Sequence, residues 1–85
     1  MTTPSLLTKR EATHGVFAEN SAAFAALVKA IPLERYDPMI WYEVVGIYIK
    51  LARMSSGNST HLDHHEDIAG YATLVAGEIK AGRLK

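Results

Sequence analysis

The apolar positions of this chain recur at the spacing of an α-helix along most of its length. In the first half they fall at Phe17, Phe24, Leu27, Val28 and Ile31, which recur at the 3.6-residue period of a helix. Asn20 or Ser21 suits the N-cap of this helix, and the prolines of "PLERYDP" end it because proline cannot continue a helix interior. No run alternates with period two for long, so the pattern predicts helices and no sheet.

A second long helix is expected over residues 39–54. Asp37 is a good N-cap, Pro38 suits the first helical position, and "SSGNST" interrupts the pattern at the other end. A third helix is expected to start near Asp63, because one apolar stripe runs through Ile68, Ala72, Val75 and Ile79. Ahead of all three, Gly15 can close a short helix in "TKREATHG".

These elements predict an all-α protein, a compact bundle of three to four helices. A chain of 85 residues is one domain, residues 1–85, and its ends at 1–7 and 81–85 are expected to be flexible. The helix over 39–54 is apolar on nearly every side, at Met39, Ile40, Trp41, Val44, Val45, Ile47, Tyr48, Ile49 and Leu51. Such a helix is typical of a buried one, and so short a chain cannot cover it alone. We therefore expect a homo-oligomer built on this central helix.

Polar side chains form two strips that suit each other. On the second helix one strip contains Glu43, Gly46, Lys50 and Arg53. On the third helix the other contains Asp63, Asp67, Tyr71 and Glu78. One interpretation is structural: Asp63 caps its helix and Asp67 pairs with Arg53 to hold two helices together. The other is a pocket between the helices, in which Lys50 and Arg53 donate hydrogen bonds to an anion.

The stretch "HLDHHED" contains candidate metal ligands. His61, Asp63, His65 and Asp67 are imidazole and carboxylate groups of the kind that zinc, manganese and iron accept. Their spacing matches no strong metal motif, however, and a loop–helix junction ordinarily carries such residues. We therefore assign no metal and no cofactor from the sequence. His14 lies apart from the cluster in sequence and can join it only through folding.

Composition and charge exclude several classes of protein. Nine basic and nine acidic residues balance, which argues against nucleic-acid binding through clustered positive charge. The longest apolar run carries Glu43, Lys50 and Arg53, so it is too charged for a membrane span. The first residues lack the layout of a secretory signal. We expect a protein of the cytoplasm without a membrane partner.

Three motifs together resemble a family of small bacteriophage and prophage proteins of unassigned function. The motifs are "KREATHGVFAEN", "KLARMSSG" and "DHHEDIAGYATL", and the match covers roughly residues 8–79. The residues that carry the resemblance are Arg10, His14, Gly15, Lys50, Arg53, Gly57, Asp67, Gly70 and Tyr71. The resemblance implies a phage-encoded accessory protein that acts in the cytoplasm of a host cell.

A more distant similarity is to the all-α nucleoside triphosphate pyrophosphohydrolases. Those enzymes hold magnesium with E-x-x-E on one helix and E-x-x-D on a facing helix. Glu66 and Asp67 are similar to the second half, but Glu43 has no acidic partner at Gly46 or Ile47. A magnesium site needs carboxylates as well as the substrate phosphates, so this departure argues against hydrolysis.

The leading hypothesis is a phage-encoded oligomer that binds a small phosphorylated ligand, a nucleotide above all, to sequester a defence signal or to serve phage nucleotide metabolism. The residues expected to bind it are Arg10, His14, Lys50, Arg53, Asp67 and Tyr71. No catalytic nucleophile is recognisable, so no catalytic residue is assigned. One alternative is a magnesium-dependent nucleotide hydrolase that uses Glu43, Asp63, Glu66 and Asp67. The other is a protein that inhibits a host enzyme by direct interaction and binds no ligand.

Overall fold

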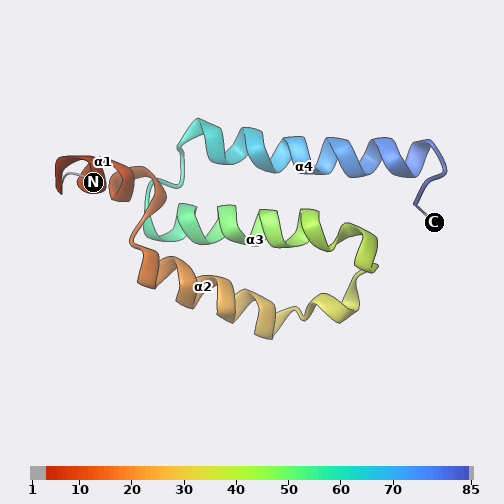
Figure 1. The fold of residues 1–85 in the computed structure, drawn as a ribbon, viewed down its shortest axis with the longest axis horizontal. Coiled ribbons are helices and arrows are strands. Elements are labelled where there is room, and N and C mark those ends of the chain that lie inside the picture. Colours follow the sequence, from red (N-terminus) through yellow and green to blue (C-terminus); the bar gives the residue numbers. More distant parts are fainter. Residues whose placement is uncertain (1–3, 85) are drawn as a thin grey trace.

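The computed structural model describes residues 4–84, with side chains from residue 9 onward, and the chain folds into helices (Figure 1). The helices are α1 (Pro4–His14), α2 (Phe17–Ala30), α3 (Trp41–Ser56) and α4 (Leu62–Lys80), with short 3₁₀ turns at Leu33–Arg35 and Pro38–Ile40. No strand occurs between residues 4 and 84, and the prediction of an all-α protein is confirmed. None of the described helices combines the length and apolar character that crossing a membrane requires.

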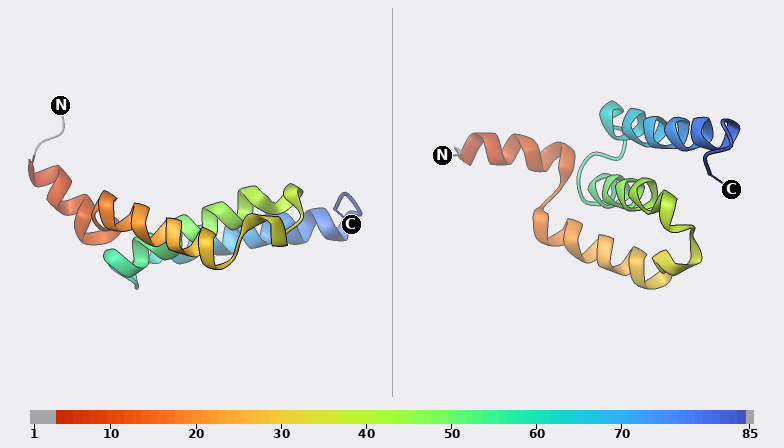
Figure 2. Two further views of the ribbon diagram at one scale, coloured as in Figure 1. Left: turned by 90° about the horizontal axis from the view of Figure 1, so that it is seen from below. Right: turned by 45° about the vertical axis from the view of Figure 1, so that its right-hand side comes forward.

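The three longer helices lie in a row with α3 in the middle. Both α2 and α4 pack along α3, while α1 contacts the C-terminal end of α3 (Figures 1 and 2). The row is elongated: its Cα radius of gyration is 14.8 Å, whereas a compact chain of this length has about 12 Å. The arrangement is therefore an open row of helices, and the expected compact bundle is not closed within one chain.

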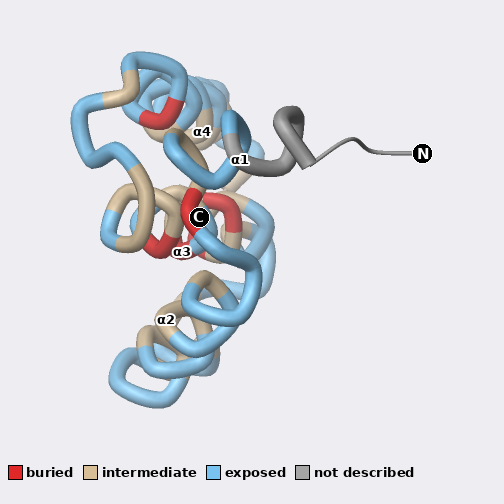
Figure 3. The backbone as a smooth tube through the Cα atoms, turned by 90° about the vertical axis from the view of Figure 1, so that its left-hand side faces the viewer, coloured by how far each residue is buried: buried red, intermediate tan, exposed pale blue. Residues whose placement is uncertain are grey.

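The core of the molecule is small and lies almost entirely on α3 (Figure 3). Val44, Tyr48 and Ala52 are its buried apolar residues, and His64 of α4 is the one buried charged or polar side chain of the described residues. Tyr48 also links α3 to the end of α2, because its hydroxyl donates to the carbonyl of Ile31 at 3.1 Å. Burial on α3 agrees with the expectation from its apolar sequence.

Many large apolar side chains stay exposed around this core. They are Val16, Phe17, Ile31, Met39, Trp41, Tyr42, Ile49, Leu51, Leu62, Leu74 and Ile79. The accessible surface is 6071 Å², compared with about 5,000 Å² for a compact monomer of this mass. The single chain therefore exposes roughly a fifth more surface than its size requires.

Two helix starts differ from the sequence prediction. The helix α2 begins at Phe17, with Val16 and not Asn20 or Ser21 at the N-cap. The side-chain amide of Asn20 instead donates to the carbonyl of His14 at 2.7 Å. The helix α4 begins at Leu62, so Asp63 lies in its first turn rather than at the N-cap. Asp37 does cap as predicted and accepts from the Met39 amide at 2.9 Å, but this turn is 3₁₀.

The C-terminal end of α4 is closed by a glycine motif that the sequence analysis did not foresee. Gly82 has φ +76°, and its N–H donates to the carbonyl of Ile79 at 3.0 Å. The N–H of Arg83 donates to the carbonyl of Glu78 at 2.9 Å. These two bonds satisfy carbonyls that a helix end leaves unpaired. Residues 81–83 thus hydrogen-bond to the end of the helix, and residues 4–7 are helical; residues 1–3 and 85 lie outside the described part. The expected flexibility of residues 1–7 and 81–85 stays a prediction.

Candidate functional site

The ends of all four helices meet at one polar junction, at the end of the molecule where α1 joins α2 and α3 joins α4 (Figure 1). The carbonyl oxygen of Thr13 is at its centre. It accepts from Nε2 of His64 at 2.8 Å and from the amide of Asn58 at 3.2 Å. The last turn of α1 is thereby joined both to α4 and to the segment after α3.

Two glycines allow the backbones to approach at this junction. Gly15 has φ +79°, a conformation that L side chains rarely adopt, and it ends α1 as predicted. A Cβ atom added at Gly57 would lie 2.6 Å from both the Gly15 nitrogen and the Thr13 oxygen. The contact is reinforced by Asn20, which accepts a hydrogen bond from the hydroxyl of Ser56. The junction is therefore a specifically built part of the fold.

A pocket of about 190 Å³ opens beside the junction. Its lining residues are Arg10, Glu11, His14, Gly15, Phe17, Asn20 and Arg53. Of the expected ligand-binding residues, the fold thus brings Arg10, His14 and Arg53 together. Neither arginine has an ion-pair partner within the described residues.

The positive charges of the two arginines act on His14. Burial lowers the pKa of His14, and the neighbouring His64 and the charges of Arg53 and Arg10 lower it further. The imidazole is therefore held neutral at neutral pH. The pocket combines two permanent cations with one neutral ring that can donate or accept a hydrogen bond.

Lys50 and Asp67, also expected in the ligand site, instead bind each other. Their side chains are 2.7 Å apart, and that of Lys50 is only 14% exposed. The hydrogen bond and the charge of Lys50 hold the pKa of Asp67 below its usual value. The expected pairing of Asp67 with Arg53 is thus corrected: Lys50 takes the carboxylate, and Arg53 is left facing the pocket.

Tyr71 lies further along the contact between α3 and α4 and outside the pocket. A Cβ atom at Gly46 would lie 2.5 Å from the Tyr71 ring, so this glycine makes room for a side chain of its own chain. Tyr42 meets Tyr71 edge-on, with ring centroids 6.0 Å apart. With Asp67, Gly70 and other α4 residues, Tyr71 lines a separate shallow hollow.

The candidate metal ligands named from the sequence are not brought together. Nε2 of His65 bonds to the Ser59 carbonyl at 2.7 Å, and Asp67 is held by Lys50. His61 and Asp63 are neighbours, with Nε2 and Oδ2 3.7 Å apart. As the side chains stand, no group of three or more His, Asp or Glu in the described part of the chain is arranged to hold a metal ion.

Sequence reasoning missed some residues of the junction. His64 is its most buried side chain, yet its position inside "HLDHH" gave no sign that it, rather than its neighbours, points inward. Asn20 was expected only as a helix cap, and Phe17 only as an apolar helix residue. The contacts that assign them join residues far apart in the sequence, such as His64 and Thr13.

Comparisons with family models, curated proteins and solved structures find no match for this chain.

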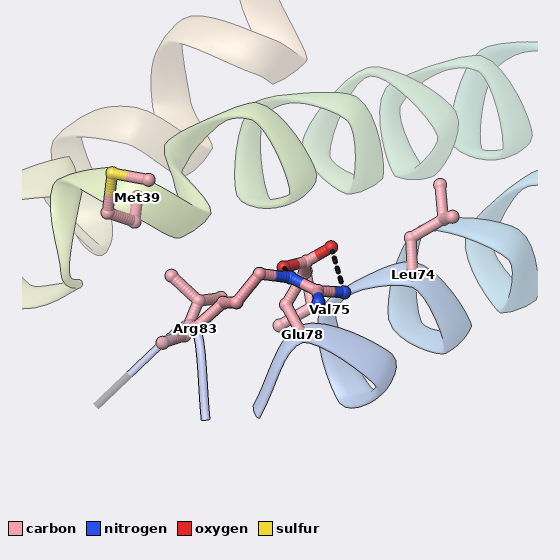
Figure 4. A pocket seen from close by; sticks show the side chains of 6 residues that line it. Met39, Leu74, Val75, Glu78 and Arg83 are labelled. Atoms are coloured by element: carbon pink, nitrogen blue, oxygen red, sulfur yellow. Dashed lines mark hydrogen bonds and ion pairs between the residues drawn. The ribbon is translucent and has the colours of Figure 1, made fainter. Parts of the chain in front are cut away.

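A larger hollow of about 530 Å³ lies at the opposite end of the row (Figure 4). Its lining is mainly apolar, with Met39, Leu74, Val75 and Leu84. Glu78, near the end of α4, and Arg83, just after it, form an ion pair with each other, so their charges neutralise each other. Because its charges are paired and its other lining residues are apolar, this hollow suits an apolar contact better than an anionic ligand.

Proposed function

We propose that this chain binds a small phosphorylated ligand, a nucleotide above all, at the pocket beside the junction. The observation that carries the proposal is the pair of arginines, Arg10 and Arg53, on one pocket without a carboxylate partner in the described residues. A guanidinium presents a planar fork of N–H donors that fits phosphate oxygens. Glu11 also lines the pocket and favours a ligand that offers a hydroxyl or an amine beside its phosphate.

The two arginines contribute in different ways. Arg53 belongs to the central helix and is half-buried, so less of its freedom is lost when a ligand binds. Arg10 is exposed on α1 and also lines the pocket. Between them, the neutral ring of His14 offers one further hydrogen bond. We therefore propose Arg10, His14 and Arg53 as the ligand-binding residues and leave out Lys50, which is paired with Asp67.

Phe17 supplies an aromatic surface at the pocket that the sequence analysis had not assigned. Its side chain is 83% exposed although it is a large apolar ring. Nucleobases stack on such rings with little dependence on base identity. The pocket itself, at about 190 Å³, is smaller than the roughly 300 Å³ at which small-molecule sites usually begin. The phosphate therefore fills the pocket and the base lies over Phe17.

The homo-oligomer belongs to the same proposal. The single chain exposes about 1,000 Å² more surface than a compact monomer, and a standard interface buries about 800 Å² on each partner. One groove between α2 and α3 is lined by Ala23, Ala26, Leu27, Ala30, Leu51, Ala52 and Ser55. Small residues of this kind let a helix of a second copy approach closely, so a second copy is the proposed occupant.

The resemblance to phage and prophage proteins supports a role in an infected cell. A small oligomer that holds nucleotides there either sequesters a defence signal or serves phage nucleotide metabolism. The hydrolase alternative gains no support, because Asp67 is bound to Lys50 and no three carboxylates gather in the described residues. Direct inhibition of a host protein stays the second candidate, since exposed side chains such as Tyr42 and Leu74 suit a protein contact.

Calorimetric titration with mono-, di- and cyclic nucleotides tests the proposal. The wild type is expected to bind at least one member of the panel. Arg53→Lys keeps the charge and loses the fork, so binding falls at least tenfold while the fold survives. Arg35→Ala is the matched control: it removes an exposed arginine of the 3₁₀ turn Leu33–Arg35, away from the pocket, and leaves binding unchanged.

The outcomes separate the candidates. Arg53→Ala leaves the carboxylate of Asp67 paired, because Lys50 binds it. This variant is therefore expected to stay folded and to lose nucleotide binding. If the wild type binds no member of the panel, the nucleotide proposal falls and the interaction protein replaces it. An equal loss in Arg35→Ala and Arg53→Lys would instead show non-specific charge attraction.

A further inference from the structure

Three histidine rings from separate parts of the chain gather at the junction. His14 ends α1, His61 precedes α4, and His64 lies in the first turn of α4. The ring centroids are 5.7 Å apart for His14 and His61, 5.0 Å for His14 and His64, and 4.9 Å for His61 and His64. Three imidazoles bound to one tetrahedral zinc ion have centroids about 5 Å apart, because each Zn–N bond is about 2.0–2.1 Å long. The spacing of the three rings matches that arrangement.

The hydrogen bonds of His64 fix which of its nitrogens is free. Nε2 lies 2.8 Å from the carbonyl oxygen of Thr13, which can only accept, so Nε2 carries the proton. Nδ1 then presents a lone pair. That atom is buried and has no hydrogen-bond partner in the structure, and the residue is 0% exposed. A buried acceptor without a donor is costly, and native proteins rarely leave one unexplained.

The other two rings follow the same pattern. The hydroxyl of Thr13 lies 3.2 Å from the Arg10 carbonyl oxygen and 2.6 Å from Nδ1 of His14. In the tautomer in which Nδ1 of His14 donates to this hydroxyl, Nε2 of His14 keeps a lone pair. Nε2 of His61 lies 3.7 Å from the carboxylate of Asp63, which is an ion-pair distance rather than a hydrogen bond, and this leaves Nδ1 for a ligand. Metal-binding histidines ordinarily direct one nitrogen to a carbonyl, hydroxyl or carboxylate in this way, and bind the ion with the other.

We infer that His14, His61 and His64 form a three-histidine site for a zinc-class transition-metal ion, with a fourth position left for water or an anion. As the side chains stand, the three rings do not form a group that could hold a metal ion. Binding therefore requires the rings of His14 and His61 to turn about their side-chain bonds. Both are half-buried, and the side chain of His61 is 28% exposed, so they have room to turn while the buried His64 stays in place.

The surrounding charges set the conditions for binding. Arg10 and Arg53 act on His14 and oppose a divalent cation there, whereas Asp63 beside His61 favours it. His65 and Asp67 take no part, because Ser59 and Lys50 hold them. The inference does not rest on the proposed nucleotide site: a chain that binds zinc and no nucleotide satisfies it.

Zinc titration of the untagged, chelator-treated chain tests the inference. Calorimetry is expected to give one zinc ion per chain, and cobalt(II) in its place is expected to give the visible absorption of a tetrahedral site. His61→Ala abolishes binding and the absorption. His65→Ala is the matched control, since it removes a histidine four residues away that bonds only to Ser59, and it binds zinc like the wild type.

A second variant tests the hydrogen bond behind a ligand. Thr13→Val keeps the carbonyl that holds His64 and removes the hydroxyl that orients His14. Loss of such a partner weakens metal binding by about 10–100-fold. Zinc should also raise the melting temperature of the wild type and leave that of His61→Ala unchanged. Nucleotide binding is measured separately in chelator, so the two proposals fail independently.

Two results would overturn the inference. One is a wild type that takes up no zinc at the concentrations that calorimetry requires. The other is binding that His65→Ala weakens as much as His61→Ala, which would place the ion on the surface of the "HLDHH" stretch instead. Circular dichroism checks that each variant is folded, and Thr13→Val decides the matter if His61→Ala is not.

Discussion

Lys50 and Arg53 lie one turn apart on α3, yet the fold gives them different surroundings. Lys50 meets Asp67 across the contact between α3 and α4, while Arg53 lines the pocket with Arg10 and His14. The pairing also explains why a lysine can lie on so apolar a helix: its charge is neutralised by a partner, and the rest of its side chain packs.

The Lys50–Asp67 pair makes stability depend on pH in a defined direction. Because the pKa of Asp67 is lowered below 3.8 in the folded chain, the pair stabilises the fold above that value and loses its contribution as the pH falls through the lowered pKa. We predict that Lys50→Met lowers the melting temperature at pH 7. We also predict a smaller fall in melting temperature between pH 5 and pH 2 than in the wild type, measured by circular dichroism.

Asp63→Asn is the control for this experiment. Asp63 lies on α4, like Asp67, but Lys50 does not contact its carboxylate. Its acid dependence should stay close to that of the wild type. A Lys50→Met protein with an unaltered acid profile would mean that the pair contributes nothing to the fold.

At this scale the sequence predicted which residues are polar but not which residues they meet. The polar strip on α3 follows from helical periodicity. It does face α4, because Lys50 binds Asp67 and Gly46 lies against the ring of Tyr71. The choice of Lys50 rather than Arg53 as the partner of Asp67 depends on how α4 lies along α3. That relation is set by long-range packing, which local spacing does not contain.

Among the elements, the positions of the helix ends decide the site. The helices themselves were predictable, because their apolar stripes and the Asp37–Pro38 start are strong local signals. The ends were less so: Asn20 serves α1 instead of capping α2, and Gly82 closes α4 through bonds that only the folded backbone displays. The site lies at such ends, so it was harder to predict than the fold.

The contact between α1 and α3 at Gly57 is predicted to admit no side chain. A Cβ atom there would meet backbone atoms of Thr13 and Gly15 at 2.6 Å. We therefore expect Gly57→Ala to lower the free energy of unfolding by about 1–3 kcal/mol. Urea denaturation measures the change.

Gly77→Ala provides the opposite case. Gly77 lies inside α4, and its added Cβ atom would meet nothing within 4 Å. Alanine is the better helix former by about 0.5–1 kcal/mol, so this variant should be more stable than the wild type. If both glycines responded alike, the close approach at Gly57 would not be the cause.

The whole molecule is a row of helices whose broad sides carry apolar residues. Leu51 is 39% exposed in the apolar groove between α2 and α3. We predict that the wild type is a homodimer or larger, and that Leu51→Glu separates it into single chains by placing a charge at the interface. Light scattering coupled to size exclusion measures the mass.

Thr73→Glu adds the same charge on an exposed position of α4 and should leave the assembly intact. A wild type that runs as a single chain at micromolar concentration would contradict the oligomer. In that case a different partner would have to cover the exposed apolar side chains.

The central claim is that the junction pocket holds a phosphorylated ligand, and native mass spectrometry tests it most directly. The assembly is sprayed with each nucleotide of the panel, for the wild type and for Arg53→Lys. The account predicts wild-type assemblies that carry added mass equal to one ligand per chain, and the same assemblies without it in Arg53→Lys. Wild-type assemblies that carry no added mass with any nucleotide would contradict the account.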